Sequence, residues 1–265
     1  MIDIWWQMIL SFLNNNTGIL LLLVLGMMFF FIFVKKVKQY FFSRGKTGAG
    51  VTVIFISCLF FFQFLVFCLK PIVAYVYFYY GFICLYEKKH DIAYQEFLTA
   101  HQLSPDNRGI LDRLAFAAYS SRPPEEAVKI FEELEKVGIS SDMMIYYGHL
   151  LLSTGNPEKA KKMLEFASKH ALHPTFAYFY LGVYRQQRKE YPEALALMQK
   201  TLAQAGEDKN FVRWYMLRIY GEMQDEPAML ALLREMVKDP DPNDKYAQDA
   251  QKLLDVYEKG KKIQP

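Results

Sequence analysis

Residues 181–198 read LGVYRQQRKEYPEALALM, and this stretch shows the unit from which most of the chain is built. Gly182 is followed 12 residues later by Ala194, and Met198 comes four residues after that alanine. Residues four apart in a helix share a face, so Ala194 and Met198 point into one seam. A small residue on the facing helix lets the two backbones approach closely. The stretch therefore predicts two short helices packed against each other.

The same spacing occurs five times between residues 74 and 240. The residue of the first helix recurs at intervals of 34, 33, 34 and 34 residues. A fixed period in this range indicates stacked helix pairs, an α-solenoid, because one pair alone cannot bury its apolar face. The five sets are Gly81/Ala93/Phe97, Ala115/Ala127/Phe131, Gly148/Ala160/Leu164, Gly182/Ala194/Met198 and Met216/Ala228/Leu232.

Turn-forming residues separate the copies and split each copy in two. Proline stands near the start of the second helix in four copies, at Pro124, Pro157, Pro192 and Pro227, where the first turn tolerates it. An amphipathic segment after Pro240 is typical of the polar capping helix that ends such arrays. The expected repeats cover about residues 74–107, 108–140, 141–174, 175–208 and 209–240, with the capping helix at about 243–259.

This pattern resembles the tetratricopeptide repeat (TPR). The first copy carries the family's small residue, alanine, aromatic, second alanine and proline at Gly81, Ala93, Phe97, Ala100 and Pro105. The resemblance covers about 165 of the 265 residues. It implies a protein-binding array but names no partner, because a fold does not fix a function.

The resemblance also implies a concave groove lined by the first helix of each pair. The lysine and asparagine clamp of chaperone-binding members is absent, since none of the corresponding positions holds either residue. An aromatic groove with scattered polar groups suits an apolar-anchored peptide or helix of a partner protein. The alternative is that some of these aromatic residues belong to the core between repeats. The predicted groove residues are Asp112, Phe116, Tyr119, His149, Leu152, Phe179, Val183, Gln186, Arg213 and Tyr220.

The N-terminal part of the chain is strongly apolar. Apolar residues make up 52% of the chain and aromatic residues 16%, and the excess lies before residue 87. Residues 18–34 and 51–69 are each long enough to cross the hydrocarbon core of a bilayer. A cleavable signal peptide is the alternative for the first run, but its basic residues follow the run instead of preceding it. We expect a membrane anchor over residues 1–70.

Residues 35–50 carry five basic residues and no acidic residue. Gly45-Lys46-Thr47 is similar to the end of a phosphate-binding loop, but that loop needs a glycine where Tyr40 stands. We interpret residues 35–50 as a basic hairpin between two membrane helices. The positive-inside rule then places the hairpin in the cytoplasm and the array on the far side, which in a bacterium is the periplasm. A cytoplasmic array is the alternative, since Lys70, Lys88 and Lys89 favour it.

Residues 72–86 admit two interpretations. They hold no charge and several tyrosines, and Lys70-Pro71 precedes them as the expected end of the second span. They could form a third, short span. The repeat register favours the first helix of the first repeat, because Gly81 must pair with Ala93 for that unit to fold. The tyrosines would then suit a helix at the membrane interface or against the second span.

The sequence contains no recognisable catalytic constellation. Cys58, Cys68 and Cys84 lie in apolar helical stretches and are expected to be buried thiols. His170 and His173 are three residues apart, but Pro174 and the lack of a third ligand favour a solvent-exposed pair over a metal site. Of the chain's net charge of +3, the part before residue 71 carries +5, which leaves −2 for residues 71–265 and no basic stripe for nucleic acid. We therefore expect no enzyme activity, cofactor, metal, nucleic acid or small-molecule substrate.

Together these features predict an all-α protein, with two N-terminal transmembrane helices followed by a TPR α-solenoid over residues 71–265. One hypothesis is a scaffold or adaptor, tethered to the inner membrane, for a protein partner in a bacterial envelope assembly of the flagellar or secretion/export type. The layout resembles such assembly proteins. The other hypothesis is a structural subunit of a multi-subunit membrane complex whose groove stays empty. The phenylalanine-rich spans argue against tight helix packing, which favours small residues.

Overall fold

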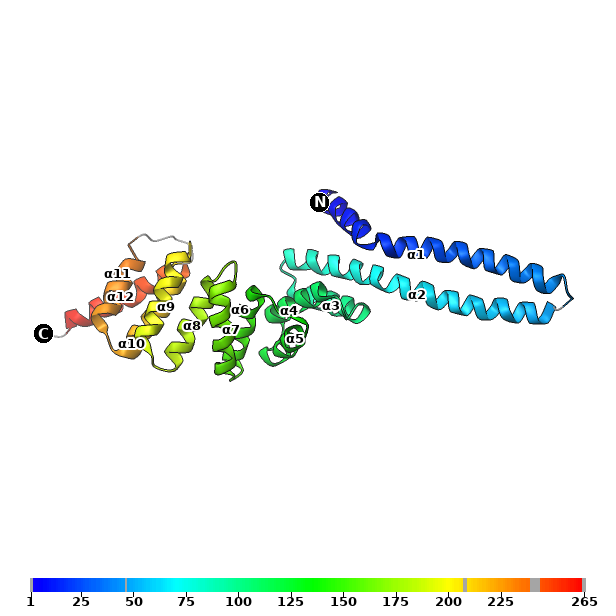
Figure 1. The fold of residues 1–265 in the computed structure, drawn as a ribbon. Helices are drawn as coiled ribbons and strands as arrows, with labels where there is room; N and C mark the ends of the chain where they lie inside the picture. The colour runs from blue at the N-terminus through cyan, green and yellow to red at the C-terminus, as the bar shows by residue number, and fades with distance from the viewer. Residues whose placement is uncertain (1, 46, 207–208, 239–243, 264–265) are drawn as a thin grey trace. The chain divides into compact units, whose positions relative to one another are not determined.

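The computed structural model describes residues 2–45, 47–206, 209–238 and 244–263, and these are helical apart from short turns (Figure 1). The side chains of residues 2–17, 19, 20, 47 and 260–263 lie outside this description. The chain forms two compact units, residues 1–122 and 123–265, and each is described by itself. The predicted all-α repeat fold is confirmed by the succession of short helix pairs that follows the N-terminal helices.

The first unit begins with a hairpin of two long helices, α1 (Ile2–Phe42) and α2 (Thr47–Tyr86). Close contacts join them: the rings of Phe30 and Phe61 stack with centroids 4.2 Å apart. A Cβ added to Gly26 would lie 2.6 Å from a ring carbon of Phe64, so glycine permits this approach. The helices take up most of residues 35–50, which the sequence predicts to be the connection between them. Because nothing between residues 35 and 42 breaks a helix, α1 continues to Phe42.

Helix α2 corrects one expectation from the sequence. The helix does not end at Lys70-Pro71, because α2 passes through Pro71 and continues to Tyr86. A proline inside a helix removes one backbone hydrogen bond, and neighbouring packing can sustain the helix across it. The second apolar segment and the first helix of the first repeat are therefore one helix.

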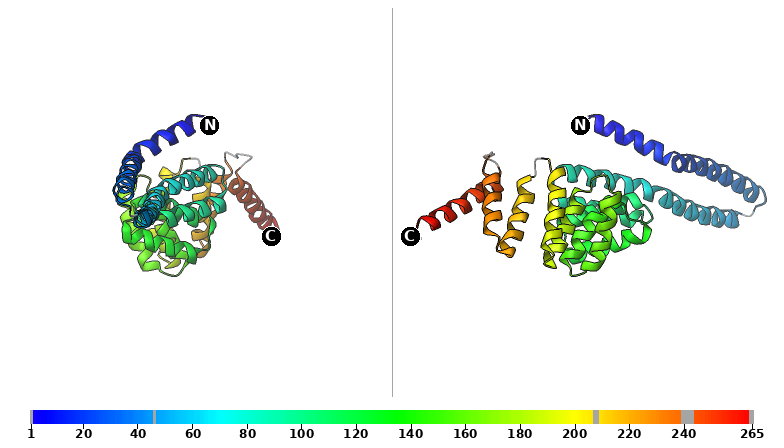
Figure 2. Two further views of the ribbon diagram at one scale, coloured as in Figure 1. Left: turned by 90° about the vertical axis from the view of Figure 1, so that its right-hand side faces the viewer. Right: turned by 60° about the vertical axis from the view of Figure 1, so that its left-hand side comes forward.

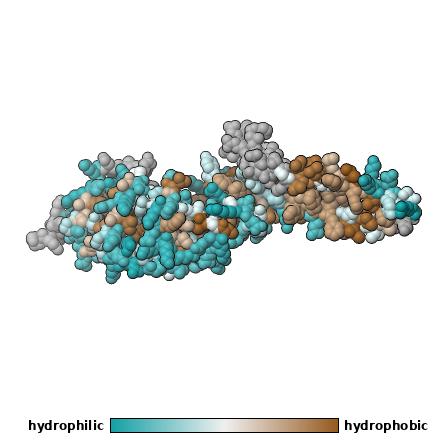
Figure 3. Space-filling model, viewed as in Figure 1, coloured by the Kyte–Doolittle hydropathy of each residue, from teal (hydrophilic) through white to brown (hydrophobic). Residues whose placement is uncertain are grey.

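The surface of α2 is apolar over most of its length. Within the described residues, one helix is long and apolar enough to cross a membrane, and it covers residues 48–86. Hydrophobic side chains dominate the described surface of residues 21–34 and 51–69 (Figure 3). Cys58 is exposed on this surface, so the expectation that all three cysteines are buried is wrong for it. A free thiol behaves as a small hydrophobic group, so it is compatible with the exposed apolar surface of this helix. The span expected at residues 18–34 stays a prediction.

The first repeat is completed by α3 (His90–Leu103), and α4 (Arg108–Ser121) follows it in the same unit. Phe97 of α3 is fully buried, and a Cβ added to Gly81 of α2 would lie 2.9 Å from its ring. Phe78 and Phe82 of α2 also contact the Phe97 ring, with centroids 5.7 and 6.5 Å away. The predicted seam between a glycine and a bulky residue therefore joins α2 to α3.

The second unit contains eight helices within its described residues, and each packs beside the next along the chain (Figure 2). The seam recurs here: a Cβ on Gly148 would meet Leu164 at 2.6 Å, and a Cβ on Gly182 would meet Met198 at 2.8 Å. The helices are α5 (Pro124–Val137), α6 (Ser141–Ser153), α7 (Pro157–His170), α8 (Thr175–Gln187), α9 (Tyr191–Gln204), α10 (Lys209–Met223), α11 (Glu226–Met236) and α12 (Lys245–Ile263).

Three of the turns inside the helix pairs of the second unit share a backbone conformation. Gly155, Lys189 and Gln224 have φ of +82°, +62° and +58°, and they follow α6, α8 and α10 at intervals of 34 and 35 residues. This left-handed conformation lets the chain reverse between two antiparallel helices. Only glycine adopts it without steric cost.

Candidate functional site

In the first unit, α4 carries three of the predicted groove residues on one face. Asp112, Phe116 and Tyr119 are four and three residues apart, and all three are half-buried. Asn107 caps the helix, with its side-chain oxygen accepting from the backbone nitrogens of Gly109 and Ile110. Burial raises the pKa of Asp112, against the opposing effect of nearby arginines. The face therefore combines two aromatic rings with a carboxyl group that is partly withdrawn from water.

In the second unit, α6, α8 and α10 carry the other seven. His149 of α6 stacks on Tyr180 of α8, with ring centroids 4.4 Å apart and planes 12° from parallel. Burial lowers the pKa of His149, so the neutral imidazole is favoured there. Leu152, Val183 and Tyr220 are also half-buried. These four predicted residues keep some surface for a partner.

Two of the predicted residues are covered by the repeats themselves. Phe179 is only 3% exposed and packs against Phe211 and Tyr215 of α10, with ring centroids 5.0 and 4.6 Å away. Gln186 is 6% exposed, and its Nε2 donates a hydrogen bond to Glu222 Oε1 at 2.7 Å. Both side chains join α8 to α10. The sequence pattern alone could not separate this core role from groove lining.

Arg213 is held within its own helix pair. Its guanidinium forms an ion pair with Glu235 of α11 and donates a hydrogen bond to Asn210 Oδ1 at 3.0 Å. A partner carboxylate would have to compete with Glu235. Arg213 therefore joins α10 to α11 through its ion pair with Glu235.

A row of aromatic rings, which the groove prediction missed, links α8, α10 and α12. Phe176 contacts Tyr180, Phe179 contacts Phe211, and Phe211 contacts Tyr246 with centroids 5.7 Å apart. The sequence does contain a signal for this row, since Phe176, Phe211 and Tyr246 are 35 residues apart. Phe176 is half exposed and continues the row to the surface.

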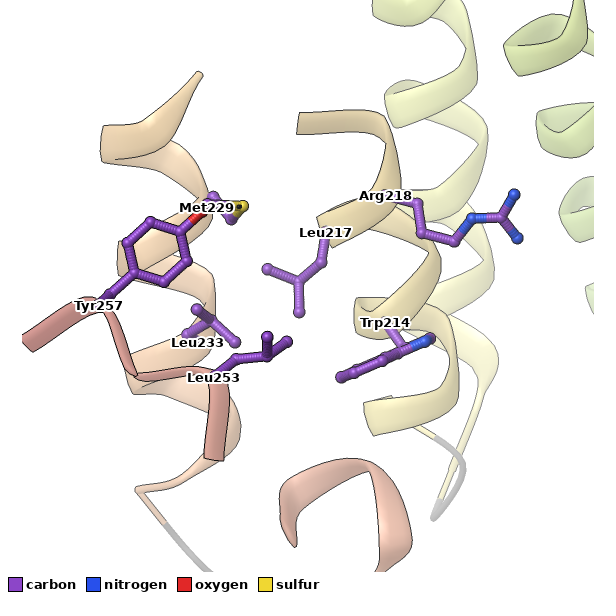
Figure 4. A pocket seen from close by; sticks show the side chains of 7 residues that line it. All are labelled: Trp214, Leu217, Arg218, Met229, Leu233, Leu253 and Tyr257. Carbon is purple, nitrogen blue, oxygen red and sulfur yellow. Dashed lines mark hydrogen bonds between the residues drawn. The ribbon is translucent and has the colours of Figure 1, made fainter. Parts of the chain in front are cut away.

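A small apolar pocket lies between α10, α11 and α12 (Figure 4). Its volume is about 180 Å³, and Leu217, Leu233 and Leu253 point toward one another across it. The guanidinium of Arg218 points away from this cluster. The pocket has room for one apolar side chain and offers little polar recognition. Its lining is Trp214, Leu217, Arg218, Met229, Leu233, Leu253 and Tyr257.

Metal ligands are not gathered anywhere in the described part of the chain: no group of three or more His, Cys, Asp or Glu side chains is placed to hold an ion. His170, one of the two histidines considered above, is exposed, stacks on Phe166 and lies with Nδ1 2.9 Å from the Phe166 carbonyl oxygen.

Comparison with solved structures shows the same fold in several TPR proteins. YrrB, a TPR protein with an unusual peptide-binding site, is 18% identical with a TM-score of 0.52, and the match covers 66% of this chain and 90% of YrrB. MamA from Desulfovibrio magneticus RS-1 is 16% identical with a TM-score of 0.54, covering 61% of this chain and 92% of that one. PilW, a type IV pilus biogenesis factor, is 14% identical with a TM-score of 0.57, and the match covers 83% of this chain and 97% of PilW.

At these identities the likeness concerns the fold alone. No protein-family model matches the chain, and no curated protein matches it.

Proposed function

We propose that this chain, whose helix pairs have the tetratricopeptide-repeat fold, is a membrane-tethered adaptor that binds a protein partner of a bacterial envelope assembly. Helix α2 carries the proposal, because one continuous helix provides both the apolar membrane segment and the first helix of the first repeat. The first repeat is therefore attached to the proposed span without a flexible linker. A flagellar or secretion/export machine is the kind of assembly we propose, and PilW, a pilus biogenesis factor of the same fold, is compatible with it.

The partner-binding surface that we propose in the second unit consists of His149, Leu152, Val183 and Tyr220. These half-buried side chains expose apolar and aromatic surface on successive first helices, as a groove for an apolar-anchored peptide or helix requires. Phe179 and Gln186 support this surface from below, because they fix the spacing of α8 and α10.

The proposed topology has the turn between α1 and α2 in the cytoplasm and the repeats in the periplasm. It rests on Lys35, Lys36, Lys38 and Arg44, which lie at the turn end of the hairpin. A reporter active only outside the cytoplasm, fused after Pro265 and separately near Gly45, tests it. Activity at the C-terminal fusion alone is the expected result. The reverse pattern would place the array and its partners in the cytoplasm.

Partner binding is tested with a photo-crosslinking amino acid at Val183 of the full chain in its host membranes. We expect a crosslinked protein that is lost in the variant Tyr220→Ala. The variant Ala196→Glu, on an exposed position of α9, serves as the control and should leave the crosslink unchanged. A second experiment places the crosslinking amino acid at His149 and introduces Val183→Glu. If the crosslink survives both Tyr220→Ala and Val183→Glu, this surface is excluded as the binding site.

A structural subunit with an unused groove is the second candidate. The burial of Phe179 and Gln186 favours it, since part of the expected groove is filled by the repeats themselves. Under this alternative, Tyr220→Ala changes neither membrane insertion nor the composition of the complex purified with the chain. Loss of one component with normal insertion supports the adaptor.

A further inference from the structure

Helix α2 is too long for a bilayer to accommodate its apolar residues by tilting. Residues 48–86 number 39 and, at about 1.5 Å per residue, measure about 58 Å. A hydrocarbon core about 30 Å thick admits about 39 Å of helix even at a tilt of about 40°. About 20 Å of apolar helix therefore lies outside the hydrocarbon and needs another environment.

The repeat covers only one face of this remaining segment. Ala74, Gly81 and Cys84 are buried, and Gly81 packs on Phe97. Phe78 and Phe82 also contact the Phe97 ring. Several other side chains of the segment are exposed, and no charge occurs from Pro71 to Tyr86. The exposed residues are Val73, Val76, Tyr77, Tyr80, Phe82 and Tyr86, with exposed fractions from 36 to 89%.

Part of this exposed surface continues the membrane-facing surface of the span. Phe62, Val66 and Leu69 are exposed three and four residues apart, and the same spacing leads on through Val73 and Val76 to Tyr80. Along this line of exposed residues, the side chains change from purely apolar ones to tyrosine. Tyrosine is enriched at the level of lipid headgroups, where its ring is buried and its hydroxyl meets water.

We infer that the outward face of residues 73–80, which carries Val73, Val76 and Tyr80, lies in the headgroup region of the membrane and holds the first repeat against the bilayer. The inference rests on the proposed membrane tether and adds a lipid-binding surface to it. A second copy of the chain fits this face less well. A second copy packed along this line of exposed residues would meet Phe62, Val66 and Leu69 within the bilayer. Close helix packing in a bilayer uses small residues instead.

A tryptophan placed on this face tests the inference in the full chain. Trp5, Trp6 and Trp214 are replaced by phenylalanine, and Tyr80→Trp is reconstituted in vesicles of phosphatidylcholine and phosphatidylglycerol. Lipids brominated near the glycerol or at the chain ends then report depth, and acrylamide reports contact with water. Phe60→Trp, in the span, and Phe166→Trp, on exposed α7, are the lipid and water controls.

The expected result is that Tyr80→Trp loses most of its fluorescence to lipids brominated near the glycerol and little to those brominated at the chain ends. Quenching by acrylamide as strong as in Phe166→Trp would overturn the inference. Protection from both quenchers would also overturn it, because another protein surface would then cover the face. Val76→Trp repeats the measurement one turn earlier if Tyr80→Trp fails to fold.

The Phe60→Trp control separates this inference from the proposed function. If Phe60→Trp is not quenched by either brominated lipid, the membrane tether itself fails. If Phe60→Trp is quenched and Tyr80→Trp behaves like Phe166→Trp, the tether stands and the lipid-binding face alone is wrong.

Discussion

The helix pairs α2–α3 and α8–α9 have the same seam and different surroundings. In both, a glycine of the first helix lies against a bulky residue of the second: Gly81 against Phe97, and Gly182 against Met198. Helix α8 has 13 residues, whereas α2 has 40 and crosses the repeat boundary without interruption. The same seam therefore forms whether the first helix is short or long, because it depends on local spacing alone.

The contacts around the seam differ as well. In the second unit polar groups cross between helices: Lys159 Nζ donates to Glu135 Oε2 at 2.7 Å and to Tyr147 Oη at 2.8 Å. Between α2 and α3, aromatic rings around Phe97 form the contact instead. A pair whose first helix is apolar over most of its length has few polar side chains on that helix to contribute. Its cohesion depends on ring packing and on burial of apolar area.

The largest expected effect follows from removing the central ring of the first repeat. Phe97→Ala should destabilise the α2–α3 pair by about 3–5 kcal/mol, because it empties a fully buried site that three residues of α2 line. Hydrogen exchange of the full chain in lipid nanodiscs should then show faster exchange in α3. Met198→Ala is the matched variant and should affect α9. Unchanged exchange in α3 would contradict the packing described for Phe97.

The two seam glycines of the second unit, Gly148 and Gly182, sharpen the comparison of seams. Gly148→Ala places a methyl group 2.6 Å from the branched Cγ of Leu164, whereas Gly182→Ala meets the flexible end of Met198 at 2.8 Å. Overpacking of a rigid neighbour costs about 1–3 kcal/mol, while a methionine can move aside. Chemical denaturation should show a loss for Gly148→Ala and little change for Gly182→Ala. Equal losses would mean that the methionine cannot rearrange.

These seams were predictable because each depends on residues 12 to 16 apart in one sequence motif. The expectation that α2 would end at Pro71 is wrong, because a proline inside a helix can be sustained by packing that the sequence does not display. Phe179 shows the same limit for the site. Its burial depends on how α8 approaches α10, so spacing along α8 could not assign it to core or groove.

The turns inside the helix pairs give a smaller, two-sided test. Lys189 adopts φ of +62°, and Gly155 adopts φ of +82° at the equivalent place one repeat earlier. Lys189→Gly should stabilise the second unit, and Gly155→Ala should destabilise it, each by about 1 kcal/mol, because a Cβ is strained in this conformation. Urea unfolding measures both. Shifts of the same sign would show that backbone strain is not the controlling factor.

The smallest expected effect is a pH dependence from His149. Burial lowers the pKa of His149 in the folded protein below its ordinary value of about 6.5, so between these two values the unfolded chain binds more protons. The contribution of His149 to stability is therefore complete above about pH 6.5 and is lost as the pH falls through the folded pKa. Thermal unfolding of the full chain in detergent should show a lower melting temperature in that range.

The variant His149→Gln isolates this contribution, because it keeps a polar side chain that does not titrate. Its melting temperature should depend less on pH between 5 and 6.5 than that of the unsubstituted chain, on the ordinary histidine range. His170→Gln is the matched control, since His170 is exposed at the end of α7. If both variants flatten the pH profile equally, the stacking of His149 on Tyr180 does not hold the imidazole away from water. If only His149→Gln flattens it, the α6–α8 contact contains the titrating group, and a partner that buries this ring further should bind more weakly at acidic pH.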